Sequence, residues 1–269
     1  MRLLLLIIII STNLSHANSP ITVVSDPWCP FVCNETQDSK GLVLELASAA
    51  LKVSINKQLK FESMSWARSK IFAQKGKRDA IAGLERTEKN KGLFTFPKTS
   101  LGRSTICLFK SKSNPWQFLD GPSLHHQRLG WVNHYLYGSK VDFLDAHIEK
   151  LQNENSKYLT IISGSNHIHK RLLNMIIEER IDVIAEDYSV IKHTIAQQGL
   201  TKKIAMAGCI ESSETFVYLA FSNNIKHAQQ YADALDNGIK TIIKNGQAAE
   251  ILSRYGLTVE ESIQVNSWN

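Results

Sequence analysis

Two cysteines, two prolines and two aromatic residues lie within the segment DPWCPFVC, residues 26–33. Cysteines this close together can hold a metal, form a redox pair, supply a catalytic thiol or close a disulfide ring. Three residues separate Cys29 from Cys33, whereas a thioredoxin-type motif has two, and no second close pair completes a zinc site. The compartment in which the protein folds decides among the remaining chemistries.

The first residues of the chain have the pattern of an export signal. Arg2 is followed by an apolar run over 3–10 and then by a polar stretch with small residues at Ser15 and Ala17. A membrane-spanning helix needs about 20 apolar residues. We therefore predict a signal peptide over 1–17, cut after Ala17, in preference to a short membrane anchor. The mature protein is expected to be soluble and exported, with no membrane span.

In an oxidising compartment, the four cysteines of the chain are expected to form two disulfides. Three connectivities are possible. Cys29 and Cys33 are close enough to close a small ring, which leaves Cys107 with Cys209. Loop-closure entropy gives about 2 kcal/mol of stabilisation for such a ring and about 4.7 kcal/mol for a loop of about 100 residues. The first bridge would mainly shape a loop, and the second would tie distant segments together.

Composition and motifs argue against several classes of function. The formal net charge is +6, and the basic residues are scattered, unlike those of a nucleic-acid-binding surface. The sequence has no GxSxG, no glycine-rich phosphate loop and no HExxH. Neither His125 and His126 nor His167 and His169 share one helix face, so we expect solvated histidines, no metal and no cofactor.

Strand-like and helix-like segments alternate along the mature chain. β-branched or alternating patterns predict strands at 21–26, 57–64, 79–83, 105–109, 128–132, 158–163, 181–187 and 215–222. Apolar residues at helical spacing predict helices at 41–53, 67–74, 139–154, 165–180, 188–198, 226–246 and 247–256. This alternation predicts an α/β protein with mainly parallel sheets, in which ligands bind beyond the carboxyl ends of strands.

Several short motifs occur in a characteristic order along the chain. They are WCPF, GLVLEL, SWAR, KGKRDAIAG, RTEKN, FTFP, SGS, IDVIAED, VYLAFS and DNGIKTIIKNGQAAEILSRYGL. In this order they resemble the bacterial extracellular solute-binding proteins of family 3, the periplasmic receptors of polar amino-acid ABC transporters. The resemblance runs from about Ile21 to Leu257, nearly the whole mature chain.

The resemblance implies the two-lobed, type II periplasmic-binding-protein fold, with two parallel or mixed sheets flanked by helices and joined by two hinge strands. Lobe 1 would comprise 18–107 plus 214–269, and lobe 2 would comprise 108–213. Cys107 and Cys209 would then lie beside the hinge strands, where a bridge closes without straining the lobes. We expect a monomer that closes on a small solute between its lobes.

Transferred motif by motif, the family's pocket positions give a binding set without a catalytic residue. In lobe 1 they are Trp28 and Phe31, Trp66 and Arg68 of SWAR, and Gly83, Glu85 and Arg86. In lobe 2 they are Ser165 and Asp187. Ser165 begins a helix, which favours an anion or a carbonyl, and Asp187 stands where amino-acid receptors carry the acid that grips the ligand ammonium.

Structural roles compete with several of these assignments. Trp28 and Phe31 could be core residues, and so could Trp66, which starts a helix. Asp187 precedes the helix at 188–198 and could be its N-cap, a role compatible with ligand binding.

One position departs from the family's pattern. After RTEK, amino-acid receptors carry an arginine that clamps the ligand α-carboxylate, and here that position is Asn90. Glu85 stands where a small hydroxyl residue is usual, and it would repel a carboxylate. Only a swing of Arg86, Arg68 or Arg103 would offset this. A cationic solute, either amine-rich or without a free carboxylate, is therefore an alternative to an α-amino acid.

We therefore expect a periplasmic protein that binds a small polar, amine-bearing solute in an interlobe cleft for ABC-type uptake, with a permease as its partner. One alternative is a ligand-sensing partner of a membrane receptor. The other is an enzyme of the periplasmic dehydratase type on the same fold, for which Glu85 and Asp187 could supply an acid–base pair.

Overall fold

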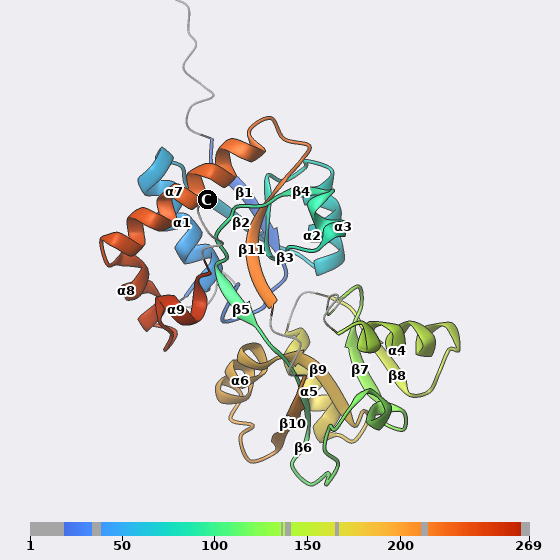
Figure 1. The fold of residues 1–269 in the computed structure, drawn as a ribbon. Coiled ribbons are helices and arrows are strands. Elements are labelled where there is room, and N and C mark those ends of the chain that lie inside the picture. Colours follow the sequence, from blue (N-terminus) through green and yellow to red (C-terminus); the bar gives the residue numbers. More distant parts are fainter. Residues whose placement is uncertain are drawn as a thin grey trace, which may run out of the picture.

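The computed structural model describes residues 19–33, 39–135, 137, 141–164, 167–210 and 215–264. The predicted signal peptide over 1–17 and the predicted site residue Ser165 lie outside these residues. The described chain forms two bodies, each a sheet flanked by helices (Figure 1).

The first body contains a mixed sheet of six strands built from both ends of the chain. Its order is β2 (Leu59–Ser63), β1 (Ile21–Ser25), β3 (Ala80–Glu85), β11 (Thr215–Ser222) and β4 (Phe94–Thr95), and β5 (Gly102–Ser104) pairs with β11. Strand β1 is parallel to both of its neighbours, whereas β11 is antiparallel to its partners. The helices of this body are α1 (Leu42–Ile55), α2 (Trp66–Gln74), α3 (Glu88–Lys91), α7 (Ala228–Lys244), α8 (Gln247–Ser253) and α9 (Val259–Ser262).

The second body contains a mixed sheet of five strands. Its order is β10 (Ile204–Cys209), β6 (Ile106–Ser111), β9 (Val183–Asp187), β7 (Leu129–Val132) and β8 (Leu159–Ile162). Its helices are α4 (Asp142–Asn153), α5 (Ile168–Ile177) and α6 (Tyr188–Gln197), with a 3-10 turn at Gly121–Leu124. Mixed sheets flanked by helices agree with the α/β prediction. The expectation of mainly parallel sheets is wrong, because five of the nine strand pairings in the described residues are antiparallel.

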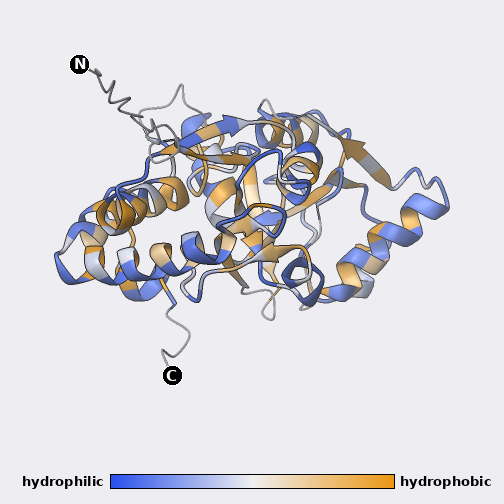
Figure 2. Cartoon of the chain, turned by 90° about the horizontal axis from the view of Figure 1, so that it is seen from above, coloured by the Kyte–Doolittle hydropathy of each residue, from blue (hydrophilic) through white to orange (hydrophobic). Residues whose placement is uncertain are grey.

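Helices α1 and α7 pack together on the first sheet because each has an apolar face at helical spacing. On α7 the buried residues include Leu235, Ile239 and Ile242. Gly238 lies where the two helices come closest, and a Cβ there would be 2.1 Å from the carbonyl oxygen of Ala50. Figure 2 shows the corresponding alternation of polar and apolar colour along the helices.

The chain passes from the first sheet to the second at Thr105, between β5 and β6. It returns after β10 through residues that include 211–214, which lie outside the described part. Cys107 and Cys209 are register partners on β6 and β10, and they are joined by a disulfide. With the Cys29–Cys33 bridge, this gives the two pairings expected from the sequence.

Strand β10 is an element that the sequence pattern did not predict. Its residues IAMAGC are mostly small and carry little of the β-branched signal of the other strands. A register shift between Met206 and Gly208 interrupts its pairing with β6, so the alternation of side chains is broken as well. The predicted lobe boundaries at 107/108 and 213/214 stay predictions, and the second falls on residues that the structure does not describe.

Within the described residues, no helix is both long and apolar enough to span a membrane.

Candidate functional site

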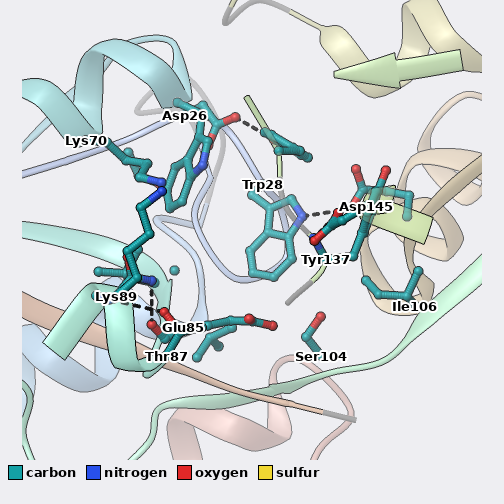
Figure 3. A pocket seen from close by; sticks show the side chains of 18 of the residues that line it. Asp26, Trp28, Lys70, Glu85, Thr87, Lys89, Ser104, Ile106, Tyr137 and Asp145 are labelled. Carbon is teal, nitrogen blue, oxygen red and sulfur yellow. Dashed lines mark hydrogen bonds between the residues drawn. The ribbon is translucent and has the colours of Figure 1, made fainter. Parts of the chain in front are cut away.

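A cavity of about 430 Å³ lies between the two bodies (Figure 3). Its position follows from the topology, because the carboxyl ends of β1, β3, β7 and β9 open onto it. Helices α2 and α3 border it from the first body, and α4 borders it from the second. The volume suits a small ligand held between two lobes.

The indole of Trp28 stands in the middle of this cavity (Figure 3). Its loop is closed by the Cys29–Cys33 bridge and by a hydrogen bond from the Trp28 amide to the Val32 carbonyl, 2.7 Å long. Behind it, the ring of Phe31 stacks on the indole at 4.6 Å. Phe31 is only 2% exposed and lies outside the cavity lining, so its role is to support Trp28.

Gly83 lies beside the Trp28 ring, at a φ of +81° that side chains rarely adopt. A Cβ at this position would lie 3.6 Å from Trp28 Cε3. Glycine thus accommodates the register shift at which Gly83 is skipped in the pairing of β3 with β11.

Asp26, which directly follows β1, forms a hydrogen bond between the two bodies. The Tyr135 hydroxyl, from the segment after β7, donates to Asp26 Oδ2 at 2.5 Å. Burial raises the pKa of Asp26 to about 6, although the hydrogen bond from Tyr135 lowers it. Asp26 therefore changes its charge near neutral pH at the lining of the cavity.

Glu186, near the end of β9, is the buried carboxyl group of the second body that reaches the cavity. Trp28 Nε1 donates to its Oε1 at 3.3 Å, and the ring of His169 lies 3.1 Å from its Oε2. Burial disfavours the charged form of His169, but the nearby acids, Glu186 first among them, together outweigh this, so the pKa of His169 is raised. The expectation of solvated histidines is wrong here, because His169 is only 6% exposed.

Asp187 lies next to Glu186 in the chain but outside the cavity lining. Its carboxyl group accepts hydrogen bonds from the amides of Thr105, at 3.1 Å, and Val190, at 3.0 Å, and it is the N-cap of α6. Burial raises the pKa of Asp187 to about 7. Adjacent strand residues point to opposite faces, which explains why Glu186 reaches the cavity and Asp187 binds the crossing segment.

The first turn of α4 adds Asp142 and Asp145 to the cavity lining. The backbone amide of Tyr137 donates to Asp145 Oδ1 at 3.0 Å, and the Tyr137 hydroxyl donates to the Ala185 carbonyl at 2.7 Å. These contacts fix the ring of Tyr137 and the carboxylate of Asp145 on the side of Trp28 that belongs to the second body (Figure 3).

Lys70 of α2 and Lys89 of α3 line the other side of Trp28. Burial lowers the pKa of Lys70, and repulsion from Lys89 lowers it further. Lys70 also lies over the ring of Trp66, with its Nζ 6.0 Å from the ring centroid. The cavity therefore has a basic side, which the sequence analysis did not identify.

The arginines expected near the ligand lie elsewhere. Arg68 is exposed and stacks over Phe72 at 4.9 Å, and Arg86 is exposed outside the lining. Arg103 lies over Phe216 at 5.3 Å. Asn90 does line the cavity, but its side-chain amide donates to the Glu85 carbonyl at 2.9 Å, which stabilises the loop.

Four of the predicted site residues line the cavity: Trp28, Trp66, Gly83 and Glu85. Four lie outside its lining: Phe31, Arg68, Arg86 and Asp187. The residues that the sequence analysis missed include Asp26, Lys70, Lys89, Ser104, Tyr135, Tyr137, Asp142, Asp145 and Glu186. Two of these could have been found, because Asp26 directly follows a strand, and Lys70 is one helical turn from Trp66.

No group of three or more histidine, cysteine or acidic side chains in the described residues is arranged to hold a metal ion.

Comparison with known proteins assigns the chain to a family. The model of the bacterial extracellular solute-binding proteins, family 3, matches residues 21–258. The chain belongs to this family. No curated protein matches the sequence.

Solved structures share the fold of this solute-binding protein at low sequence identity. A histidine kinase sensor domain similar to periplasmic binding proteins has a TM-score of 0.71 and 14% identity, over 89% of this chain and 96% of that one. The arginine-, lysine-, histidine-binding protein ArtJ from Geobacillus stearothermophilus has a TM-score of 0.69 and 14% identity, over 89% and 96%. AbpA from Streptococcus pneumoniae, an amino acid ABC transporter substrate-binding protein bound to L-arginine, has a TM-score of 0.68 and 17% identity, over 88% and 93%.

Proposed function

We propose that this protein binds a small polar, amine-bearing solute between its two bodies in the periplasm and delivers it to an ABC permease. The main structural support for this proposal is the excess of acidic groups in the cavity. Among the described residues, six acidic side chains line it against two lysines: Asp26, Glu85, Glu88, Asp142, Asp145 and Glu186 against Lys70 and Lys89. Glu88 is paired with Lys91 and Glu186 with His169. A protonated amine or a guanidinium would still be attracted to a lining with this many acidic groups.

Burial strengthens the attraction of two of these acidic groups for a cationic ligand. Asp26 is 3% exposed and Glu186 is 2% exposed, so water screens them little. A carboxylate buried without a cation costs free energy, which appears at Asp26 as its raised pKa. An ammonium group bound beside Asp26 would remove this cost, and the free energy so released would contribute to affinity.

Aromatic rings supply the other part of the recognition. Trp28, Trp66, Tyr135 and Tyr137 line the cavity, and Trp66 and Tyr135 meet edge to face at 6.3 Å between ring centroids. Aromatic faces attract cations and cover the apolar parts of a solute. Two of the structural neighbours are named for basic amino acids or were solved with L-arginine, which supports the same ligand class.

A ligand screen tests the proposal. Isothermal titration calorimetry of the mature protein with amino acids, polyamines and short peptides should give binding of at least one amine-bearing solute and none of uncharged sugars. Asp26→Asn should weaken that binding, whereas Asp233→Asn on the exposed face of α7 should not. Binding of a neutral or purely anionic solute alone would refute the proposal.

Sensing is the second candidate function, because the similar structures include a histidine kinase sensor domain. Uptake of the radiolabelled solute by a deletion strain separates the two functions. Lost uptake supports transport. Normal uptake with a lost transcriptional response to the solute supports sensing.

A further inference from the structure

We propose that Lys70 and Lys89 form an anion-binding pair, so that the ligand is a long amphoteric amine whose carboxylate lies between the two lysines. Its cationic group would lie farther along the cavity, beside the acidic side chains that include Asp26 and those on the opposite side of Trp28. This inference rests on the proposed function and narrows its ligand class.

The two lysines converge from separate helices. Lys70 extends from α2 and Lys89 from α3, and Figure 3 shows both side chains reaching toward one another at the edge of the cavity. Their proximity is also seen in the repulsion that Lys89 exerts on Lys70. Convergence of two flexible, positively charged side chains is unfavourable unless an anion lies between them.

Neither lysine forms a close ion pair with an acidic side chain of the described residues. In the part of the chain that the structure describes, the ion pairs within 4.0 Å leave out both Lys70 and Lys89. Glu88, the acid next to Lys89 in the chain, is paired with Lys91 instead. The ammonium groups of the pair thus keep their hydrogen-bond donors available for a ligand.

The lysine pair also supplies a binding group for a ligand carboxylate, which Asn90 does not. Asn90 replaces the carboxylate-clamping arginine of similar receptors, and its side chain is used within its own loop. Arg68 and Arg86 do not line the cavity. Lys70 and Lys89 are the basic residues among the described lining, so a ligand carboxylate would bind there.

The two charged sides of the cavity define the shape of the ligand. Lys70 and Lys89 lie on one side of Trp28, and Asp145 with Tyr137 lies on the other (Figure 3). A compact α-amino acid carries its ammonium and carboxylate on one carbon and cannot reach both sides with opposite charges. A solute whose carboxylate and terminal cation are separated by a chain can do so, with the chain lying on the Trp28 indole.

Matched ligand pairs test this inference by calorimetry. L-Arginine is compared with agmatine and 6-aminohexanoate with hexylamine, because each second member lacks the carboxylate. We expect the wild type to favour the carboxylate-bearing member about tenfold or more, as for a charge-assisted hydrogen bond. Lys70→Gln and Lys89→Gln should reduce this preference at least fivefold, mainly by weakening the carboxylate-bearing member. Lys77→Gln, at an exposed lysine just after α2, should leave it unchanged.

An anion probe separates this inference from the proposed function. Sulfate at millimolar concentration should raise the Tm of the wild type more than that of the Lys70→Gln/Lys89→Gln double variant. If amines bind without any preference for the carboxylate, or if the double variant keeps the preference, the inference is overturned and the proposed function stands. If no amine binds but sulfate acts through the pair, the proposed function fails and the anion site stands. If neither sulfate nor an amine acts, both are refuted.

Discussion

Replacing Asp26 by asparagine should change stability and ligand affinity in opposite directions. The pKa of Asp26 is raised by burial from 3.8 to about 6. Its stabilising contribution is therefore fully present below about pH 3.8 and is lost as the pH rises through 6. At pH 8 the ionised, buried carboxylate of Asp26 destabilises the unliganded protein. The same carboxylate attracts a cationic ligand and so raises its affinity.

The magnitude follows from the size of the shift. A rise of about two pKa units corresponds to about 3 kcal/mol at pH 8, at 1.36 kcal/mol per unit. Asparagine is neutral at every pH and still offers an oxygen to the Tyr135 hydroxyl. Asp26→Asn should thus stabilise the unliganded protein by up to about 3 kcal/mol at pH 8 and by little at pH 4. Its affinity for the cationic ligand should fall by 2 kcal/mol or more, roughly thirtyfold.

Two measurements check this reasoning. Urea unfolding of the wild type and the variant at pH 4, 6 and 8 gives the stability difference. Calorimetry gives the ligand affinity, which in the wild type should fall about tenfold from pH 7 to pH 5 as Asp26 becomes protonated. In Asp26→Asn this dependence should be much weaker. Equal wild-type affinity at both pH values, or a variant that binds as tightly as the wild type, would refute the role given to Asp26.

Three further changes have expected outcomes. His169→Gln should lower the free energy of unfolding by about 3–5 kcal/mol at pH 5.5, because it leaves the buried acid Glu186 without its cation. The loss should be smaller at pH 8.5, because the pKa of His169 is raised, so the contribution of the imidazolium is full below pH 6.5 and is lost as the pH rises through the folded-state pKa. Urea unfolding at both pH values measures the two losses. Replacing Cys107 and Cys209 together by serine should lower the free energy of unfolding by about 4.7 kcal/mol. Loss of the Cys29–Cys33 bridge should lower it by only about 2 kcal/mol, because that bridge closes a much shorter loop. Equal decreases of Tm in the two variants would contradict this prediction. Gly238→Ala should destabilise the first body by about 1–3 kcal/mol through overpacking. Gly92→Ala is the matched control in the same thermal melts, because the Cβ added there would lie 3.6 Å from its nearest neighbouring atom.

The sequence by itself determined the fold class, the family and the loop at the centre of the site. Apolar patterns predicted most of the longer strands and helices, because the period of hydrophobic residues is a local property. They did not predict β10 or the short elements β4, β5, α3 and α9. The spacing of the cysteines indicated both bridges. Trp28, directly before Cys29, lies in the cavity lining, and its role in ligand binding stays a prediction.

Only the tertiary structure decided which charged side chains meet. Glu186 and Asp187 are adjacent acids at one strand end, and the packing of β9 determines that Glu186 faces the cavity. Lys70 and Lys89 are 19 positions apart on two helices, and nothing local in the sequence brings them together. Their convergence depends on how α2 and α3 are placed around β3, because side-chain position between separate elements is set by long-range packing.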